Sequence, residues 1–348
     1  MKSLAVTKDL KLEVVEVSMP KHGDNEMLVK TLSCGVCNGT DTKILHGKFK
    51  NIDVTEYPCL LGHEAIGEIV KIGKNVVSFE VGDKIMMPFS GAEDEGYSSY
   101  WGGYSEYGIC SDWKAMANNG EGPGSDNFGD YIYTQSKLPK DIDPADAVMI
   151  ITFREVLSSA KIFGFEANKS LAVFGAGPVG LSFIKFAKML GVSPIIVFDI
   201  VDEKLEEAKK MGADYTFNST KVDPAVAVKE ICKDGVDFSL DAVGVNALIQ
   251  KGMELIKDGG AICIYGISPN LSMDLDWSKA PYNWNLKFQQ FPVKAAEAAA
   301  HEQIMNWIEL GVLDPKDFIS HVIDFDNVLD AFEIIEKKQP CKKIVIKY

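Results

Sequence analysis

Short apolar runs with a two-residue period fill the first part of the chain, up to about Pro139. Leu10, Leu12 and Val14 alternate with polar neighbours, which is the pattern of a strand with one buried face. Further runs of strand length, each bounded by Gly, Asp or Asn, are residues 27–32, 65–72 and 81–87. Short strands separated by turns of this kind predict a small β-barrel or sandwich.

From about Asp143 the pattern changes to apolar runs of strand length that alternate with segments of helical period. Gly191 and Gly212 each follow the last apolar position of such a segment, which is typical of a helix end. The predicted strands are 171–174, 195–199, 236–241 and 261–265, and the predicted helices are 178–190 and 203–211. This alternation predicts a parallel sheet covered by helices on both faces.

Two other stretches have a different character. Residues 118–129 contain repeated Gly together with Asn and Pro, so we expect a partly ordered surface loop rather than a substrate lid. Near the end of the chain, the spacing of Ile304 and Ile308 predicts a helix that ends at Gly311. Residues 344–346 then form a last short strand.

The composition is that of a globular protein with about two domains. The chain has 348 residues, of which 46% are hydrophobic, and single cores rarely grow beyond about 250–300 residues. The net charge of -14 repels phosphate backbones and anionic lipid, which argues against nucleic-acid and membrane-surface partners. No apolar run could span a bilayer, and Lys8, Asp9 and Lys11 interrupt any signal-peptide core. The 7 scattered cysteines are typical of a reducing cytoplasm.

A glycine loop lies between the predicted strand 171–174 and the helix that follows it. Its sequence is Gly175-Ala176-Gly177-Pro178-Val179-Gly180. In a dinucleotide site, Gly175 permits the tight turn, Gly177 admits the pyrophosphate, and Gly180 packs the helix against the strand. Pro178 and Val179 open the helix, whose N-terminal N–H groups attract phosphate. The alternative is a glycine turn in a doubly wound domain that binds another ligand.

Asp199 ends the next predicted strand, where the acidic residue that binds the ribose hydroxyls belongs. A carboxylate at this position repels a 2′-phosphate, and no Arg lies nearby to neutralise one. The sequence therefore predicts NAD rather than NADP as the cofactor.

Residues of the types that bind metals lie in three segments, which are Cys34-Gly35-Val36-Cys37, Gly62-His63-Glu64 and Arg154-Glu155. Spacing alone leaves their role open. A structural zinc ribbon needs a second Cys-x-x-Cys pair, which the chain lacks. Cys37 could instead be a small buried apolar residue, and His63 a hydrogen-bonded structural histidine.

Five motifs, taken in order, resemble those of the medium-chain, zinc-dependent alcohol and polyol dehydrogenases over nearly the whole chain. They are Cys34–Cys37 with Gly39-Thr40-Asp41, Gly62–Gly67, Val81–Ile85, Gly102–Tyr107 and Gly175–Gly180. The resemblance implies an α/β architecture that begins with a GroES-like, β-rich catalytic domain over residues 1–145. A Rossmann domain, with a doubly wound parallel sheet that binds NAD, would follow over 146–291. Residues 292–348 would return to the catalytic domain.

Carried over residue by residue, the resemblance makes Cys37 the thiolate ligand and His63 the imidazole ligand of a catalytic zinc. Glu64 would bind the zinc directly or hold another ligand. Glu155 lies where the sorbitol dehydrogenase-like branch has a glutamate and alcohol dehydrogenases proper have a cysteine. Two carboxylates together with a thiolate would make the site anionic and reduce the acidity of a bound alcohol. We therefore expect that Glu64 and Glu155 do not both bind tightly at once.

The chemistry that the resemblance implies begins with zinc, which lowers the pKa of the substrate hydroxyl. The adjacent carbon then gives a hydride to the nicotinamide. Thr40 is the candidate for the hydroxyl that passes on the proton, although Asn38 is inserted between Cys37 and the Gly-Thr-Asp motif and shifts its place.

A second departure from the family concerns a structural zinc. Many relatives carry four clustered cysteines between the Gly-Asp-Lys and Gly-Gly-Tyr motifs. Here the span from Phe89 to Trp101 contains no cysteine, and Cys110 is alone. We predict one catalytic zinc and no structural zinc.

Four further residues have two interpretations each. Arg154, the only arginine, could hold an anionic substrate with its bidentate fork or could form an ion pair with an acidic neighbour. His46 could line the substrate pocket, but a surface turn is favoured. Trp101 and Tyr104 could form a wall of the pocket, but packing is favoured.

The sequence thus predicts a cytoplasmic, NAD-dependent zinc dehydrogenase that interconverts a secondary alcohol and a ketone. The substrate is expected to be a polyol, a cyclitol or a sugar derivative, and relatives imply a homodimer or homotetramer. One alternative is a zinc-free reductase of enones or quinones with the same fold. Another is a non-catalytic NAD-binding regulator.

Overall fold

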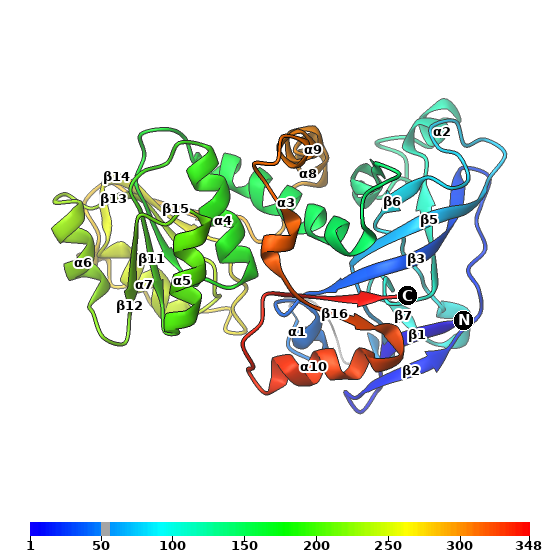
Figure 1. Cartoon of the computed structure of the whole chain (residues 1–348), viewed down its shortest axis with the longest axis horizontal. Helices are drawn as coiled ribbons and strands as arrows, with labels where there is room; N and C mark the ends of the chain where they lie inside the picture. The colour runs from blue at the N-terminus through cyan, green and yellow to red at the C-terminus, as the bar shows by residue number, and fades with distance from the viewer. Residues whose placement is uncertain (50–55) are drawn as a thin grey trace. The chain divides into compact units, whose positions relative to one another are not determined.

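A computed structural model of the chain describes residues 1–49 and 56–348 (Figure 1). The chain divides into two compact units. Unit 1 comprises Met1–Thr152 and Val293–Tyr348, and unit 2 comprises Phe153–Pro292. The division falls inside helix α3 (Pro144–Phe163), so the domain boundaries at 145/146 and 291/292 stay predictions.

Unit 1 is built mainly from short strands, as the alternating pattern predicts. One sheet has the order β2-β1-β4-β7, and a second has the order β16-β17-β3-β5-β6-β9, with β8 also paired to β3. The strands are β1 Lys2–Val6, β2 Leu12–Glu16, β3 Glu26–Val36, β4 Cys59–Leu60, β5 Glu64–Ile72, β6 Lys84–Met86, β7 Ser98–Ser99, β8 Tyr107–Ser111, β9 Lys137–Leu138, β16 Ile319–Asp324 and β17 Lys343–Lys347.

The helices of unit 1 are short. They are α1 Asp41–Leu45, α2 Trp113–Asn118, α8 Lys294–Ala299, α9 His301–Glu309 and α10 Val328–Glu336. The 3-10 turns are η2 Glu93–Glu95, η3 Asp130–Thr134, η5 Pro315–Phe318 and η6 Phe325–Asn327. Helices α1 and α10 pack on the sheets through one apolar cluster that includes Leu4, Ile44, Phe332 and Ile344. Burial of each such side chain contributes about 1.5–3 kcal/mol.

Strand β3 is longer than the predicted run 27–32, because it pairs with three neighbours along its length. Strand β6 is shorter than the predicted run 81–87. Gly82 has φ +90 and Met87 has φ +60, so a turn precedes this strand and a left-handed residue ends it.

The segment 118–129 is irregular over nearly its whole length, as predicted. Its Glu121 accepts a hydrogen bond from Asn25 Nδ2 at 2.7 Å, and Asn119 Nδ2 donates to Asn25 Oδ1 at 2.7 Å. These contacts attach the loop to the start of β3.

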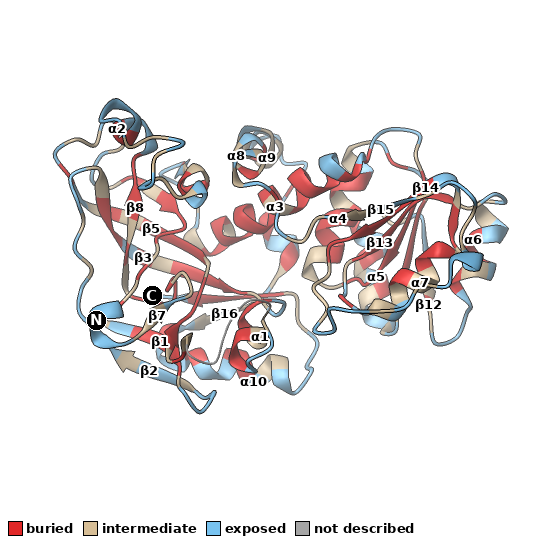
Figure 2. Cartoon of the chain, turned by 180° about the vertical axis from the view of Figure 1, so that it is seen from behind, coloured by how far each residue is buried: buried red, intermediate tan, exposed pale blue. Residues whose placement is uncertain are grey.

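Unit 2 is a parallel sheet with the strand order β12-β11-β10-β13-β14-β15. The strands are β10 Leu171–Phe174, β11 Ile195–Asp199, β12 Tyr215–Asn218, β13 Val236–Asp241, β14 Ile256–Ile264 and β15 Asn285–Phe288. The helices that follow them are α4 Pro178–Met189, α5 Asp202–Met211, α6 Pro224–Ile231 and α7 Asn246–Met253, with one 3-10 turn, η4 Trp277–Lys279. The central strands are almost wholly buried (Figure 2), which explains their continuous apolar runs.

The elements predicted for unit 2 occur close to their predicted bounds. Helices α4 and α5 end just before glycines with positive φ, +83 at Gly191 and +113 at Gly212. Strand β14 begins at Ile256, five residues before the predicted start, because a turn at Gly259 and Gly260 interrupts its apolar pattern. Strand order changes direction at β10, whose neighbours β11 and β13 follow it in sequence on opposite sides. Such a reversal opens a crevice at the carboxyl ends of the strands.

Within the residues that the structure describes, no helix is long and apolar enough to cross a membrane. All 7 cysteines are free thiols.

Asp112 provides a test of what holds unit 1 together. This buried carboxylate accepts hydrogen bonds from the N–H groups of Val77 at 2.8 Å and Ser78 at 2.7 Å, and it caps α2 through Lys114 N–H at 3.0 Å. We expect Asp112→Ala to lower the free energy of unfolding by about 3 kcal/mol, measured by denaturant titration. The exposed Asp94→Ala is the control and should change little.

The same substitution has a pH signature. Burial would raise the pKa of Asp112, but the hydrogen bonds from Val77 and Ser78 outweigh it and lower the pKa below its usual range. The carboxylate therefore contributes its full stabilisation above about pH 4 and loses it as the pH falls through the lowered value. The stability gap between wild type and Asp112→Ala should narrow in acid; a gap that widened would contradict this assignment.

Candidate active site

Three adjacent strands bring the predicted metal ligands to one place. Strand β3 pairs with β5 so that Gly35 lies opposite Glu64, and with β17 so that Val36 lies opposite Ile344. The residues just beyond these pairs are Cys37, His63 and Lys343. Segments far apart in the sequence thus meet at one end of a single ladder.

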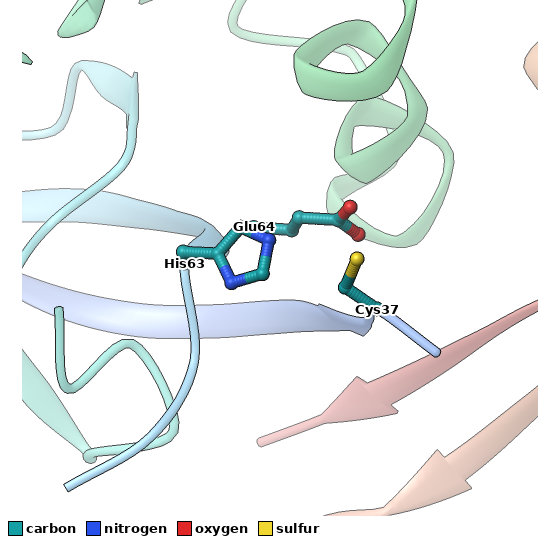
Figure 3. Close-up of side chains that lie close together, drawn as sticks. All are labelled: Cys37, His63 and Glu64. Carbon is teal, nitrogen blue, oxygen red and sulfur yellow. The ribbon is translucent and has the colours of Figure 1, made fainter. Parts of the chain in front are cut away.

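The side chains of Cys37, His63 and Glu64 point toward a common region (Figure 3). One ligand atom from each lies within 4.8 Å of the others. A thiolate, an imidazole and a carboxylate form a donor set that zinc accepts. Among the described residues, this is the one group of three or more Cys, His, Asp or Glu side chains that could hold a metal ion.

Asp41 supports this group from the start of α1. Its Oδ2 accepts hydrogen bonds from the N–H of Cys37 at 3.0 Å and from Tyr104 Oη at 2.8 Å. Its Oδ1 lies 3.6 Å from His63 Nδ1. A carboxylate beside one ring nitrogen orients the imidazole and leaves the other nitrogen for a metal. Asp41 belongs to the Gly-Thr-Asp motif, but the sequence gave no reason to assign it this role.

The ionisation of His63 reflects these neighbours. Burial acts to lower the pKa of His63, but Asp41 and Cys37 outweigh it and raise the pKa well above its ordinary value. The surroundings of this imidazole therefore favour a positive charge on it or next to it.

Lys343 is the second site residue that the sequence analysis missed. Its Nζ donates to Glu64 Oε1 at 2.8 Å and to Oε2 at 2.5 Å, and both side chains are buried. Burial acts to lower the pKa of Lys343, but Glu64 and Cys37 outweigh it and raise the pKa. The two residues are 279 positions apart, so no local pattern could have linked them.

The site has the features of one made for a divalent cation. Asp41 Oδ1 and His63 Nδ1 are buried without a hydrogen-bond partner, because 3.6 Å is too long for one. The Cys37 thiolate and the carboxylates of Asp41 and Glu64 carry three negative charges against one on Lys343. A bound Zn²⁺ would balance the remaining two, and Cys37 and His63 are of the ligand types that it prefers.

The other two predicted residues of this site lie on helices. Thr40 is the residue before α1, is buried, and donates its N–H to the carbonyl oxygen of Cys37 at 3.2 Å. Glu155 is a partly exposed residue of α3, three positions beyond Thr152, in unit 2. The role of Thr40 as proton relay and of Glu155 as zinc ligand therefore stay predictions.

Arg154 does not have the position that binding a substrate anion would require. It is 1% exposed and is the largest fully buried side chain, so its guanidinium is inaccessible to a substrate in solution. That interpretation is wrong for this structure, because the apolar surroundings of α3 enclose the side chain. His46 is exposed and bonds Thr42 O at 2.6 Å, as favoured for a surface residue.

The two aromatic residues of the Trp101–Tyr104 segment pack around the site. Tyr104 is fully buried, and its hydroxyl holds Asp41. Trp101 stacks obliquely against His63, with 5.1 Å between ring centroids. Tyr104 thus helps to position the group rather than forming a free wall.

The glycine loop of unit 2 has the geometry of a phosphate cradle. Gly175 has φ +97, a left-handed turn that favours glycine. A Cβ at Gly180 would lie 2.0 Å from the carbonyl oxygen of Gly175, so α4 approaches the loop too closely for any side chain. A Cβ at Gly177 would meet nothing within 4 Å, which leaves open space over the backbone before Pro178 and Val179. The first N–H groups of α4 face no capping side chain.

Asp199 lies beside this loop at the carboxyl end of β11. Its Oδ2 accepts the N–H of Ala176 at 2.8 Å, and its Oδ1 accepts the N–H of Val201 at 3.0 Å. The carboxylate is therefore fixed next to the glycine turn, and it is only partly buried.

Comparison with known protein families gives two matches. The alcohol dehydrogenase GroES-like domain matches residues 23–119. The zinc-binding dehydrogenase family matches residues 178–305. The first covers the segments that supply Cys37, His63 and Glu64, and the second begins within the glycine loop.

Individual relatives span nearly the whole chain. An L-threonine 3-dehydrogenase of Thermococcus kodakarensis is 31% identical, over 93% of this chain and 91% of its own length. The sorbitol dehydrogenase of Bacillus subtilis is 27% identical, over 98% of this chain and 94% of its own. The structure of a protein described as a short chain alcohol dehydrogenase from Escherichia coli CFT073, complexed with NADH, superposes with a TM-score of 0.80. It is 24% identical and covers 100% of this chain and 99% of its own.

The comparisons and the geometry agree on the chemistry. Nothing in them favours the zinc-free reductase or the non-catalytic regulator, and the Cys37–His63–Glu64 group is what a zinc enzyme requires. The GroES-like and Rossmann folds predicted from the sequence are confirmed. This chain belongs to the zinc-binding medium-chain alcohol dehydrogenase family, and it is an oxidoreductase of alcohols that uses zinc and a nicotinamide cofactor.

Proposed function

We propose that this enzyme uses NAD and a single catalytic zinc to interconvert a secondary alcohol and a ketone, with a neutral polyol, cyclitol or sugar derivative as substrate. The observation that carries the proposal is the convergence of Cys37, His63 and Glu64 within 4.8 Å. When bound, zinc acts as a Lewis acid on the alcohol oxygen, and NAD accepts the hydride from the adjacent carbon.

Each residue of the chain then has a defined task. Cys37 and His63 hold the zinc, with Glu155 as the proposed third ligand, and Asp41 keeps the His63 ring oriented. Thr40 takes the hydroxyl proton of the substrate. Its burial at the turn after Cys37 supports this role, since a relay hydroxyl must be shielded from bulk water.

Two observations support a neutral polyhydroxy substrate. Sorbitol and D-xylulose are named in two relatives, at 27% and 28% identity. Arg154, the only guanidinium of the chain, is buried, which removes the obvious partner for a carboxylate or phosphate on the substrate. The surplus of buried carboxylates near the zinc ligands would also repel an anionic substrate.

The proposed function is tested with a substrate panel and two matched cysteine variants. Neutral polyols should reduce NAD, followed by NADH absorbance, faster than sugar acids or sugar phosphates, and the protein should hold one zinc per chain. Cys37→Ala should lose the zinc and lower kcat by about a thousandfold, while it still binds NADH.

Cys34→Ala is the control for this experiment. Burial raises the pKa of Cys34 well above its ordinary value, so it stays a thiol and a poor ligand. This variant should keep its zinc. An active wild-type protein without zinc, or a Cys37→Ala variant that retains zinc and activity, would refute the proposal.

The preference for NAD rests on Asp199. A carboxylate fixed beside the glycine turn accepts ribose hydroxyls and repels a 2′-phosphate. Asp199→Asn keeps an oxygen for the N–H of Ala176 but removes the charge. We expect the ratio of kcat/KM for NAD to that for NADP to fall roughly tenfold to a hundredfold. Asp202→Asn, at the exposed start of α5, should leave the ratio unchanged; an unchanged ratio in Asp199→Asn as well would contradict the assignment.

A count of one zinc rests on the segment 89–101. It contains no cysteine, and its 3-10 turn η2 carries exposed Glu93, Asp94 and Glu95 instead. We infer that no structural zinc binds here. We also infer a cytoplasmic location, because all 7 thiols are free.

We propose that two copies of the chain pair through β15, the edge strand of the parallel sheet. Its Leu286 and Phe288 are 40% and 59% exposed, and nearby Trp277 and Tyr282 are exposed more fully. An apolar edge of this kind can pair with its own copy about a two-fold axis. Phe288→Lys should convert a dimer to a monomer in sedimentation velocity, whereas Leu310→Lys, equally exposed in unit 1, should not. A monomeric wild type would exclude this interface.

A further inference from the structure

The candidate metal site contains an ion pair that metal binding alone does not require. Lys343 Nζ bonds both oxygens of Glu64, at 2.8 and 2.5 Å, and the two side chains are only 5% and 4% exposed. Thr152 Oγ1 donates a further hydrogen bond to Oε1 at 3.3 Å. The Glu64 carboxylate is therefore held by protein donors on both oxygens.

The path between these residues exists because position 35 is glycine. Gly35 lies opposite Glu64 in the β3–β5 ladder and next to Val345 of β17. A Cβ there would lie 2.3 Å from Glu64 Oε2 and 2.5 Å from Val148. The carboxylate thus occupies the space of the missing side chain, across β3, between its own strand and the strand of Lys343.

The same carboxylate is also one of the three groups that face a metal. One of its oxygens lies within 4.8 Å of the Cys37 and His63 ligand atoms. A carboxylate that binds zinc directly would have an oxygen about 2.0–2.2 Å from the ion. Lys343 and a metal ion therefore compete for one side chain.

We propose that Lys343 is a positioning residue that holds Glu64 off the metal. The metal is then bound by Cys37, His63 and the proposed ligand Glu155, and one position is left for the oxygen of the substrate. This inference rests on the proposed function. Its chemical effect is on charge: a thiolate and one carboxylate neutralise Zn²⁺, whereas a second bound carboxylate would make the centre anionic and less able to acidify an alcohol.

The test compares zinc release in two variants. Glu64→Gln should release zinc to a chelator at the wild-type rate, because Glu64 is not a ligand. Lys343→Met keeps the length of the side chain but removes the ammonium and frees Glu64 to bind. We expect it to release zinc about tenfold more slowly, the scale on which neighbours of metal ligands act. Its kcat should fall while KM for NAD is unchanged.

Spectroscopy distinguishes this effect from a structural one. In protein loaded with Co²⁺, the visible bands report the number and type of ligands. The bands of Lys343→Met should differ from those of wild type, and those of Lys343→Met/Glu64→Gln should return to them. Lys294→Met, which removes a lysine from the buried Glu297 at 2.6 Å in the same unit, is the matched control and should leave zinc release and bands unchanged.

Each outcome decides the question. Loss of zinc in Glu64→Gln, as in Cys37→Ala, would make Glu64 a ligand and overturn the inference even if Lys343→Met does not fold. Unchanged release and bands in a folded Lys343→Met would also overturn it. A wild-type protein that holds no zinc would instead refute the proposed function itself.

Discussion

Backbone pairing of β3 with β5 on one side and β17 on the other is the constraint on which the active site depends. It fixes Cys37, the His63–Glu64 pair and Lys343 at the ends of three neighbouring strands. Because side chains alternate between the two faces of a sheet, a slip of one residue in either ladder would turn Glu64 away from Lys343. The apolar cluster around Leu4, Ile44 and Ile344 buries one face of these strands and so enforces the register.

Charge is the second constraint, and it acts on the residues that the register brings together. Buried carboxylates are costly unless each has partners. Tyr104 and the N–H of Cys37 hold one oxygen of Asp41, and Lys343 holds both oxygens of Glu64. One oxygen of Asp41 and one nitrogen of His63 are left without partners, beside an excess of negative charge. This unbalanced remainder is what makes the group a metal site rather than a packed polar core.

Unit 2 reaches its chemistry by a different route, through backbone rather than side chains. The reversal of strand order at β10 places the glycine loop between β11 and β13. Gly180 lets α4 approach the loop, and Asp199 holds the turn through the N–H of Ala176. The same carboxylate that would select NAD therefore also shapes the loop that would bind its phosphates.

The sequence by itself determined the parts that depend on local pattern. Periodicity located most strands and helices, glycine spacing located the cofactor loop, and motifs identified Cys37, His63 and Glu64. It could not reveal Lys343 or the role of Asp41, and it left open whether Arg154 was exposed. These were decided by tertiary structure, because ion pairing, burial and orientation depend on which distant strands become neighbours. The contact between residues 64 and 343 exists only through the ladder that joins β5, β3 and β17.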